Sequence, residues 1–291
     1  MEKILIVGDI HLDDRHIEEI DNIFSNDILT INADTIIQLG DFFHSAYPSP
    51  RELKYASELV KKLSTLYKKV VILSGTGEHD LVKGHSVVEH FSAISSKIVI
   101  SKGDYIYNKM LFGHFMVNES KLAFGTGRYS LKQLTDKYTY TFLGHQHIPQ
   151  RLANDRVFHL GAIRYVSFSE ADSPRHLFLL EGENAITHIP IKHCRRMVEV
   201  TSFEGLEQAD FRDKVRFVVP SFEFYKTNIN RLNECIHKYF EFKIKMDFEV
   251  KEPITIENAK IHKNDIITDY IKNIPDQEVK TILEDKFYER N

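Results

Sequence analysis

The sequence predicts an α/β fold in which a two-sheet β-sandwich is flanked by helices. Two observations carry this prediction. Before Ser96, strand-like apolar runs alternate with segments of helical periodicity, and after it short apolar runs are separated by turn residues. A chain of 291 residues, 42% of them hydrophobic, is also long enough to bury a sizeable core and to form more than one domain.

The first strands are expected at three short apolar runs, Ile4–Val7, Thr35–Leu39 and Val70–Leu73. Helices are expected between them, because apolar residues recur there at helical spacing. The two apolar stripes contain Ile17, Ile20 and Phe24, and then Leu53, Ala56, Leu59, Val60 and Leu63. This alternation predicts a βαβ arrangement at the start of the chain.

The middle of the chain is expected to add shorter strands, because its apolar runs are brief and separated by glycine. These runs are Ile98–Ile100, Tyr105–Tyr107, Met110–Phe112, Thr141–Leu143 and Leu177–Leu180. Together with the first three strands they supply enough segments for two sheets.

A small α/β module is predicted after the main core, over residues 196–255. Phe217 and Val219 belong to its first strand, and residues 242–250 alternate strictly between apolar and polar. The helix between them is inferred from an apolar stripe made of Ile229, Leu232, Ile236, Tyr239 and Phe240. The main domain is therefore expected to span 1–195, and packing of 196–255 as an extension of the core stays an alternative.

Residues 256–291 are predicted to form a helical tail. Two amphipathic stripes, within 267–274 and 279–287, flank Pro275. Short helices are marginally stable alone, so their apolar faces must pack against the chain's own core or against a partner.

Five short blocks carry the chemistry, and each follows one of the predicted strands. The blocks are Asp9-Ile10-His11, Gly40-Asp41-Phe42-Phe43-His44, Gly77-Glu78-His79-Asp80, Gly113-His114 and Gly144-His145-Gln146-His147. Each contains or follows a glycine, which lets the backbone turn sharply at a strand end. Since ligands in α/β folds gather beyond strand ends, we expect the five blocks to meet.

This set of carboxylates and imidazoles predicts a site for two divalent metal ions. Two cations close together need a shared carboxylate between them, with neutral ligands around them to limit the accumulation of charge. Asp41 is the candidate for the shared ligand. The chemistry best suited to such a pair is phosphoester hydrolysis.

The five blocks resemble the motifs of the calcineurin-like metallophosphoesterase family, and four of them match residue for residue. The resemblance implies that Asp9, His11 and His147 hold one metal and that His114 and His145 hold the other. It also implies that Asp41 bridges the two ions and that His79 lies beside the scissile phosphate. The expected reaction is phosphodiester hydrolysis without a covalent enzyme intermediate, in which His79 and His44 assist the departing oxygen.

Glu78 is the departure from the family pattern, which has asparagine at this place. We include Glu78 among the expected metal ligands. A carboxylate there adds negative charge, so it is expected to bind metal more tightly, to lower activity or to shift metal preference.

Within the family the chain is similar to the SbcD branch of DNA nucleases. His44 and the run 161–170, Gly-Ala-Ile-Arg-Tyr-Val-Ser-Phe-Ser-Glu, carry this resemblance. It implies a manganese-dependent DNA nuclease of double-strand-break repair, with a capping domain that helps select DNA shape. It also implies an SbcC-type ATPase partner bound by the C-terminal helices, and a homodimer whose interface the apolar N-terminal helices could supply. Magnesium, iron and zinc stay open as metals.

Composition bears on partners and compartment. A formal charge of −4 and a pI of about 6.4 lack the basic excess typical of nonspecific DNA binding. Possible DNA contacts are Lys83, Arg128, Lys132, Lys137, Arg151, Arg156 and Arg164. Two unpaired cysteines and the lack of a long apolar run indicate a cytoplasmic protein with no membrane span.

Two other functions stay open from the sequence. One is a phosphatase or phosphodiesterase acting on small nucleotides or phosphoproteins, which would need a closed pocket and no ATPase partner. The other is a catalytically silent scaffold, which Glu78 permits. Six further histidines have no ligand spacing and are expected to be structural: His159, His176, His188, His193, His237 and His262.

Overall fold

The computed structural model describes residues 2–120, 127–171, 173–182 and 185–247. One compact unit contains the chain up to Val218 together with Asn230–Lys245, and the second contains the remaining residues. The predicted domain boundaries after residues 195 and 255 stay predictions. Within the described residues, no helix is both long and apolar enough to cross a membrane.

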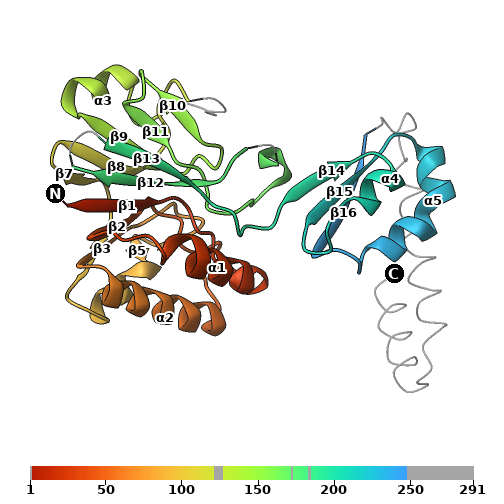
Figure 1. The fold of residues 1–291 in the computed structure, drawn as a ribbon, viewed down its shortest axis with the longest axis horizontal. Helices are drawn as coiled ribbons and strands as arrows, with labels where there is room; N and C mark the ends of the chain where they lie inside the picture. Colours follow the sequence, from red (N-terminus) through yellow and green to blue (C-terminus); the bar gives the residue numbers. More distant parts are fainter. Residues whose placement is uncertain (1, 121–126, 172, 183–184, 248–291) are drawn as a thin grey trace, which may run out of the picture. The chain divides into compact units, whose positions relative to one another are not determined.

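The first sheet has six strands in the order β13-β12-β1-β2-β3-β6 (Figure 1). Its strands are β1 (Lys3–Val7), β2 (Thr35–Gln38), β3 (Lys69–Leu73), β6 (Ile98–Ser101), β12 (His176–Glu181) and β13 (Ala185–Pro190). The four strands from β1 to β6 are parallel, whereas β12 runs antiparallel to β1. The predicted βαβ arrangement is therefore confirmed.

Two helices connect the parallel strands of this sheet. Helix α1 (Ile17–Ile23) continues into a π-helical turn at Phe24–Ile28, and α2 (Pro50–Leu66) follows β2. Helix α2 begins with a capping box in which the side chains of Ser49 and Glu52 each accept a backbone N–H of the other. Proline at the first helical position reinforces this start.

The second sheet has five strands in the order β10-β11-β9-β8-β7. They are β7 (Tyr105–Tyr107), β8 (Met110–His114), β9 (Tyr140–Gly144), β10 (Gln150–Leu152) and β11 (Val157–His159). Helix α3 (Leu131–Lys137) precedes β9, and a small hairpin of β4 (Leu81–Val82) and β5 (His85–Ser86) follows β3. The sequence did not predict β4, β5, β10, β11, β13 or α3.

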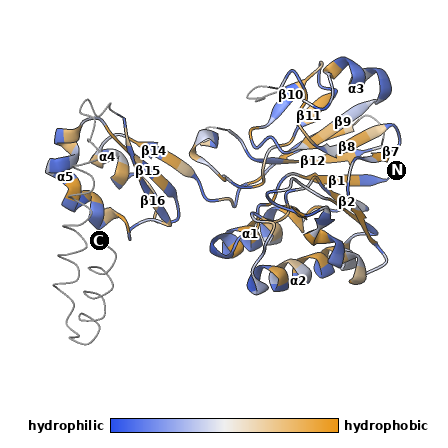
Figure 2. Cartoon of the chain, turned by 180° about the vertical axis from the view of Figure 1, so that it is seen from behind, coloured by the Kyte–Doolittle hydropathy of each residue, from blue (hydrophilic) through white to orange (hydrophobic). Residues whose placement is uncertain are grey.

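The two sheets pack face to face because alternate residues of each strand point to opposite sides. On β1, Ile4 and Ile6 face the second sheet, where they join a core cluster with Phe112 and Phe142. Leu5 and Val7 face the other way and pack with apolar residues of α1 and α2. Apolar colour is accordingly concentrated on the strands in Figure 2.

The apolar faces of α1 and α2 are buried inside the chain. Ile20, Phe24, Ala56, Val60 and Leu63 all belong to the cluster that packs on the first sheet. These faces are therefore not free to supply a homodimer interface, which corrects that part of the expectation.

The described residues 197–247 form a three-stranded sheet, β14-β15-β16, with two helices. The elements are β14 (Met197–Val200), α4 (Phe203–Glu207), β15 (Lys214–Val219), α5 (Phe222–Cys235) and β16 (Glu241–Met246). Helix α5 ends at Cys235, so the predicted stripe is too long, and Tyr239 and Phe240 lie beyond it. The predicted tail helices fall outside the described residues.

Candidate metal centre

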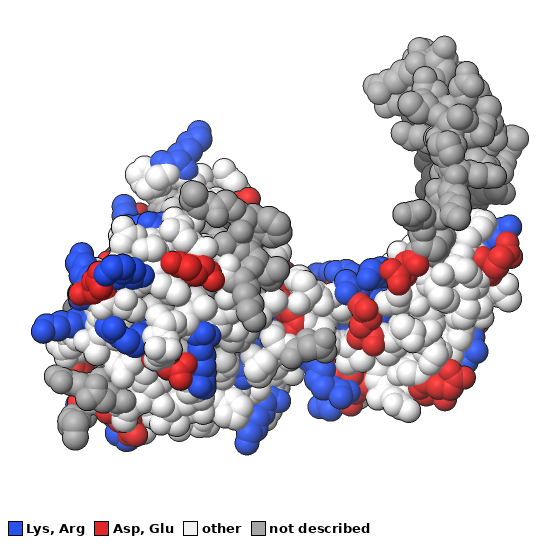
Figure 3. Space-filling model, turned by 90° about the horizontal axis from the view of Figure 1, so that it is seen from above, with Lys and Arg blue, Asp and Glu red and all other residues white. Residues whose placement is uncertain are grey.

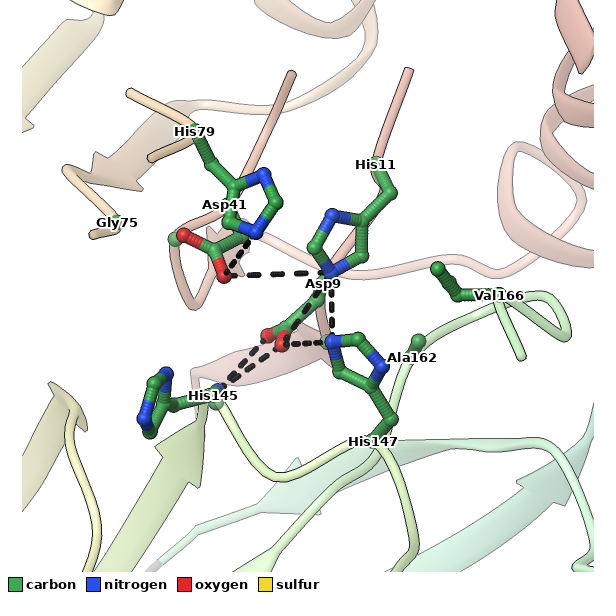
Figure 4. Close-up of polar contacts among 12 residues, drawn as sticks. Asp9, His11, Asp41, Gly75, His79, His145, His147, Ala162 and Val166 are labelled. Carbon is green, nitrogen blue, oxygen red and sulfur yellow. Dashed lines mark hydrogen bonds and ion pairs between the residues drawn. The ribbon is translucent and has the colours of Figure 1, made fainter. Parts of the chain in front are cut away.

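The chain turns after five strands place the predicted side chains around one point (Figure 4). Asp9 and His11 follow β1, Asp41 follows β2, and His79 lies in the turn after β3. His114 is the last residue of β8, and the loop after β9 carries His145 and His147. Both sheets of the sandwich therefore contribute to a single cluster.

Two groups in this cluster combine carboxylates with imidazoles, as metal sites do, and a third group of His11, His44 and His79 consists of imidazoles alone. In the first, Asp9, His11, Asp41 and His147 each offer a ligand atom, and all four atoms lie within 4.8 Å of one another. In the second, Asp41, His114 and His145 meet the same limit. The two mixed groups share Asp41, as the predicted bridging carboxylate requires; that either group binds metal stays a prediction.

Three histidines are oriented by a hydrogen bond on the ring nitrogen that faces away from the cluster. The Nδ1 of His114 donates to the Leu39 carbonyl at 2.7 Å, and that of His147 donates to a Glu170 carboxylate oxygen at 3.0 Å. The Nδ1 of His79 donates to the carbonyl of His44 at 2.7 Å. In each neutral ring the proton is thus on Nδ1, so Nε2 presents a lone pair to the cluster.

The Nε2 atoms of His114 and His147 lie close to other candidate ligand atoms. His114 Nε2 is 3.1 Å from Asp41 Oδ2, and His147 Nε2 is 2.8 Å from His11 Nε2. Without a metal, a proton lies in each of these contacts, and a divalent cation would take its place. The imidazole and carboxylate donors present are also those preferred by manganese, iron and zinc. The residues therefore fit a pair of divalent cations.

Burial and mutual charge shift the protonation of this cluster. Burial raises the pKa of Asp9 to about 7, with a further contribution from the charge of Asp41. Burial also opposes ionisation of Asp41, but the hydrogen bond and charge of His114 outweigh it and hold the pKa of Asp41 below its usual value. Burial would lower the pKa of His114, yet the two carboxylates raise it to about 9.

Three candidate ligands have a left-handed backbone conformation, which non-glycine residues rarely adopt. The φ angles are +49° at His11, +48° at Asp41 and +74° at His145. Such strain collects at functional sites, where the surrounding structure holds it in place. Here the amides of Ile10 and His11 donate to the Asp41 carbonyl, and the His145 amide donates to the Asp9 carboxylate.

Glu78 is the predicted ligand that the structure does not bring to the cluster. Its side chain is exposed, and it belongs to neither group of candidate ligands. Thr76 instead lies against the shared carboxylate, with its amide 2.7 Å and its hydroxyl 3.3 Å from Asp41 Oδ1. Gly75 is needed there, because a Cβ atom on it would clash with Asp41, whereas a Cβ on Gly77 would meet nothing.

The two predicted catalytic histidines lie at the edge of the cluster. The ring centroids of His44 and His79 are 5.7 Å apart, and each lies within 6 Å of the His11 ring, at 5.7 and 4.6 Å. His79 Nε2 is 3.9 Å from Asp41 Oδ2, and its side chain is 20% exposed. His79 can therefore reach a group bound at Asp41, and His44 lies beside His79 and His11.

Asp80 is a supporting residue that the sequence analysis did not single out. Its fully buried carboxylate accepts the backbone N–H groups of Phe42, Phe43 and Gly75, at 2.8 to 3.1 Å. It therefore ties the loop after β3 to the loop that carries Asp41. An acidic residue directly after His79 was the available sign of this role.

A second supporting network holds the loop that carries His147. Glu170 accepts from His147, from the amides of Val166 and Ser167, and from the guanidinium of Arg175. Arg175 also donates to the His147 carbonyl at 2.7 Å. Glu170 is the last residue of the run 161–170 on which the SbcD resemblance rests. In the structure this residue orients the candidate ligand His147.

Arg164 supports the site and is not an exposed DNA contact. The side chain is 2% exposed and its guanidinium donates to the His11 carbonyl and to Asp13, at 2.5 and 3.0 Å. This corrects its inclusion among the possible phosphate contacts. The guanidinium of Arg164 instead holds the backbone that orients His11 toward the cluster.

Replacing Glu170 by Gln is expected to lower manganese affinity about 10 to 100-fold, because outer carboxylates orient and polarise ligating imidazoles. Calorimetric titration with Mn²⁺ measures this. Glu181→Gln is the matched control, since Glu181 forms an exposed ion pair with Lys3. Unchanged affinity in Glu170→Gln would show that His147 needs no such partner.

Comparison with known families matches residues 2–219 to the calcineurin-like phosphoesterases. Among curated proteins, the chain is 25% identical over 195 residues to the SbcD component of the nuclease SbcCD from Staphylococcus epidermidis. That match covers 61% of this chain and 52% of the relative, so the chain spans about half of its length. Among solved structures, Pseudomonas putida nuclease MPE is 17% identical with a TM-score of 0.32, covering 64% of this chain and 87% of that one.

Proposed function

The chain belongs to the calcineurin-like phosphoesterase family, and on this basis we propose that it is a DNA nuclease that hydrolyses phosphodiester bonds with two divalent metal ions. One observation carries the proposal: imidazoles from both sheets converge on two buried carboxylates, Asp9 and Asp41, and Asp41 belongs to both groups of candidate ligands. DNA as substrate rests on the similarity to a component of the nuclease SbcCD.

Two metal ions would be held by Asp9, His11, Asp41 and His147 and by Asp41, His114 and His145. When bound, they would supply Lewis acidity at the phosphoryl group and a lowered pKa for attacking water. Manganese suits this mixture of carboxylate and imidazole ligands.

His79 and His44 would act on the departing sugar oxygen. His79 keeps its Nδ1 proton on the His44 carbonyl, so Nε2 is the nitrogen that faces a substrate and can exchange a proton with it. Burial, with help from the charge of Arg164, lowers the pKa of His44 below its usual value. The lowered pKa favours the neutral imidazole, so His44 would donate an N–H hydrogen bond to the departing oxygen and leave the proton transfer to His79.

Three of the six proposed phosphate contacts on the surface already form ion pairs. Arg128 pairs with Asp104, Lys132 with Asp136, and Arg151 with Asp155. On the face drawn in Figure 3, lysine and arginine side chains are mixed with aspartate and glutamate. DNA affinity would then come largely from the bound metals and from a partner.

We propose an SbcC-type ATPase as that partner, because the curated relative is by name a component of SbcCD. The sequence places the docking segment in the tail, which lies outside the described residues. A chain truncated after Glu257 is expected to lose co-purification with the ATPase while keeping metal-dependent hydrolysis. Retained co-purification would remove the tail from the interface.

The test of the nuclease proposal is cleavage of end-labelled linear DNA by the full chain in Mn²⁺, with and without an SbcC-type ATPase. A His79→Ala variant is run beside it. Cleavage that needs metal and is lost in the variant supports the proposal. Hydrolysis of small phosphodiesters alone would favour a nucleotide phosphodiesterase, and no turnover of either would favour a scaffold.

Replacing Glu78 by Asn is expected to keep or raise nuclease activity. The exposed carboxylate lies outside both ligand groups, so its loss removes only negative charge near the substrate. Initial rates of DNA cleavage at limiting Mn²⁺ measure this, with Glu58→Asn on α2 as a surface control. A clear loss of activity would mean that Glu78 moves to ligate metal when the site is filled.

A further inference from the structure

The loop that joins His44 to α2 presents an aromatic side chain to solvent. Tyr47 is 77% exposed, the largest value among the exposed large hydrophobic side chains of the described residues. Its ring has no ring contact and its hydroxyl no hydrogen bond within the described part of the chain. A single exposed aromatic ring is common on protein surfaces, so the meaning of Tyr47 depends on where the loop presents it.

Both ends of this loop are held in place, so Tyr47 is presented from a rigid support. On one side the amide of His44 donates to the Leu12 carbonyl at 2.9 Å, and that of Ala46 to the Glu78 carbonyl at 3.0 Å. On the other side Ser49 caps α2. Pro48 between Tyr47 and Ser49 further restricts the backbone. An aromatic surface held in this way loses little conformational entropy when it binds.

The position of Tyr47 relates it to the candidate metal centre. His44 lies three residues earlier, so the two Cα atoms are at most about 10 Å apart. The loop 44–49 has no lysine or arginine, and the neighbouring Glu78 is an exposed carboxylate that would repel phosphate. The contact that the Tyr47 ring itself can offer to a nucleic acid is with the face of a base.

We propose that Tyr47 stacks on an unpaired nucleobase next to the scissile phosphate, so that the preferred substrate is a single strand, a flap or a frayed end. This inference rests on the proposed nuclease function. An aromatic ring can stack on any base only if the base is accessible, which in a duplex interior it is not. Tyr47 is then a substrate-binding residue that selects DNA structure and not sequence.

The test compares Tyr47→Ala with Tyr47→Phe in the full chain, on a single-stranded oligonucleotide in Mn²⁺. Tyr47→Ala is expected to raise KM about tenfold, with kcat changed less than twofold, whereas the phenyl ring of Tyr47→Phe should keep KM near the wild-type value. The increase in KM caused by Tyr47→Ala should be smaller on an oligonucleotide whose flanking nucleotides are abasic, and on a blunt duplex. Phe211→Ala, at a side chain that is 70% exposed, is the matched control and should not change KM.

Binding of the same oligonucleotides is measured by fluorescence anisotropy, which separates this inference from the proposed reaction. If the wild type cleaves DNA but Tyr47→Ala does so equally well, the stacking contact is overturned while the nuclease stands. An equal effect of Tyr47→Ala on normal and abasic strands also overturns the stacking contact, because the loop would then affect binding only through its structure. Base-dependent binding through Tyr47 without any cleavage would keep the contact and overturn the nuclease.

Discussion

Replacing Asp41 by Asn should lower metal-dependent phosphodiester hydrolysis about a thousandfold. Asp41 is the one carboxylate common to both groups of candidate ligands, so the change removes charge from both sites at once. Metal ions contribute several kcal/mol of transition-state stabilisation, and each 1.4 kcal/mol corresponds to about tenfold in rate. Rates with end-labelled DNA and with a small phosphodiester, each at saturating Mn²⁺, measure the effect.

Asp136→Asn is the matched control for this change, because Asp136 pairs with Lys132 on the surface of α3. It should cleave at the wild-type rate. A fall of less than tenfold in Asp41→Asn, with the fold intact by circular dichroism, would show that Asp41 does not bridge two metals.

Replacing Asp80 by Ala should lower the free energy of unfolding by about 3 to 4 kcal/mol. The change leaves the buried amides of Phe42 and Phe43 and the partly buried amide of Gly75 without an acceptor. Burial raises the pKa of Asp80 to about 6, so the ionised carboxylate is costly in itself. The expected loss therefore comes from the unsatisfied donors. Urea denaturation of the apoprotein measures it.

Asp80→Asn separates the cost of the unsatisfied amide donors from the cost of the buried charge. Its amide oxygen can still accept from two of the three amides, so it should lose about half as much stability as Asp80→Ala. Asp136→Ala on the surface should leave the denaturation midpoint unchanged. Equal stability of wild type and Asp80→Ala would mean that the loops after β2 and β3 are held together by other contacts.

The sequence predicted the strands that position the site, because short apolar runs followed by glycine and an acidic residue or histidine are local patterns. Asp9, Asp41 and His114 all follow such runs and meet in the structure. The sequence did not predict β10 and β13, which contain polar residues, or β11, which is only three residues long; pairing with other strands stabilises all three. Strand pairing between segments that are distant in the sequence is only weakly predicted by the local residue pattern.

Glu78, a predicted ligand, lies outside the cluster for a related reason. Family spacing places a ligand one residue before His79, but β3 ends at Leu73 and the chain turns toward Asp41 at Gly75 and Thr76. The longer turn between these residues and His79 carries Glu78 to the surface. Arg164 was misassigned because burial of a charge depends on distant partners, here the His11 carbonyl and Asp13.

The most direct test of the two-metal site is anomalous diffraction from crystals of the full chain grown with Mn²⁺. The structure predicts two anomalous peaks about 4 Å apart, one among Asp9, His11 and His147 and one between His114 and His145, with Asp41 between the peaks. A single peak, or manganese bound only elsewhere on the chain, would contradict the two-metal site and the reaction proposed from it.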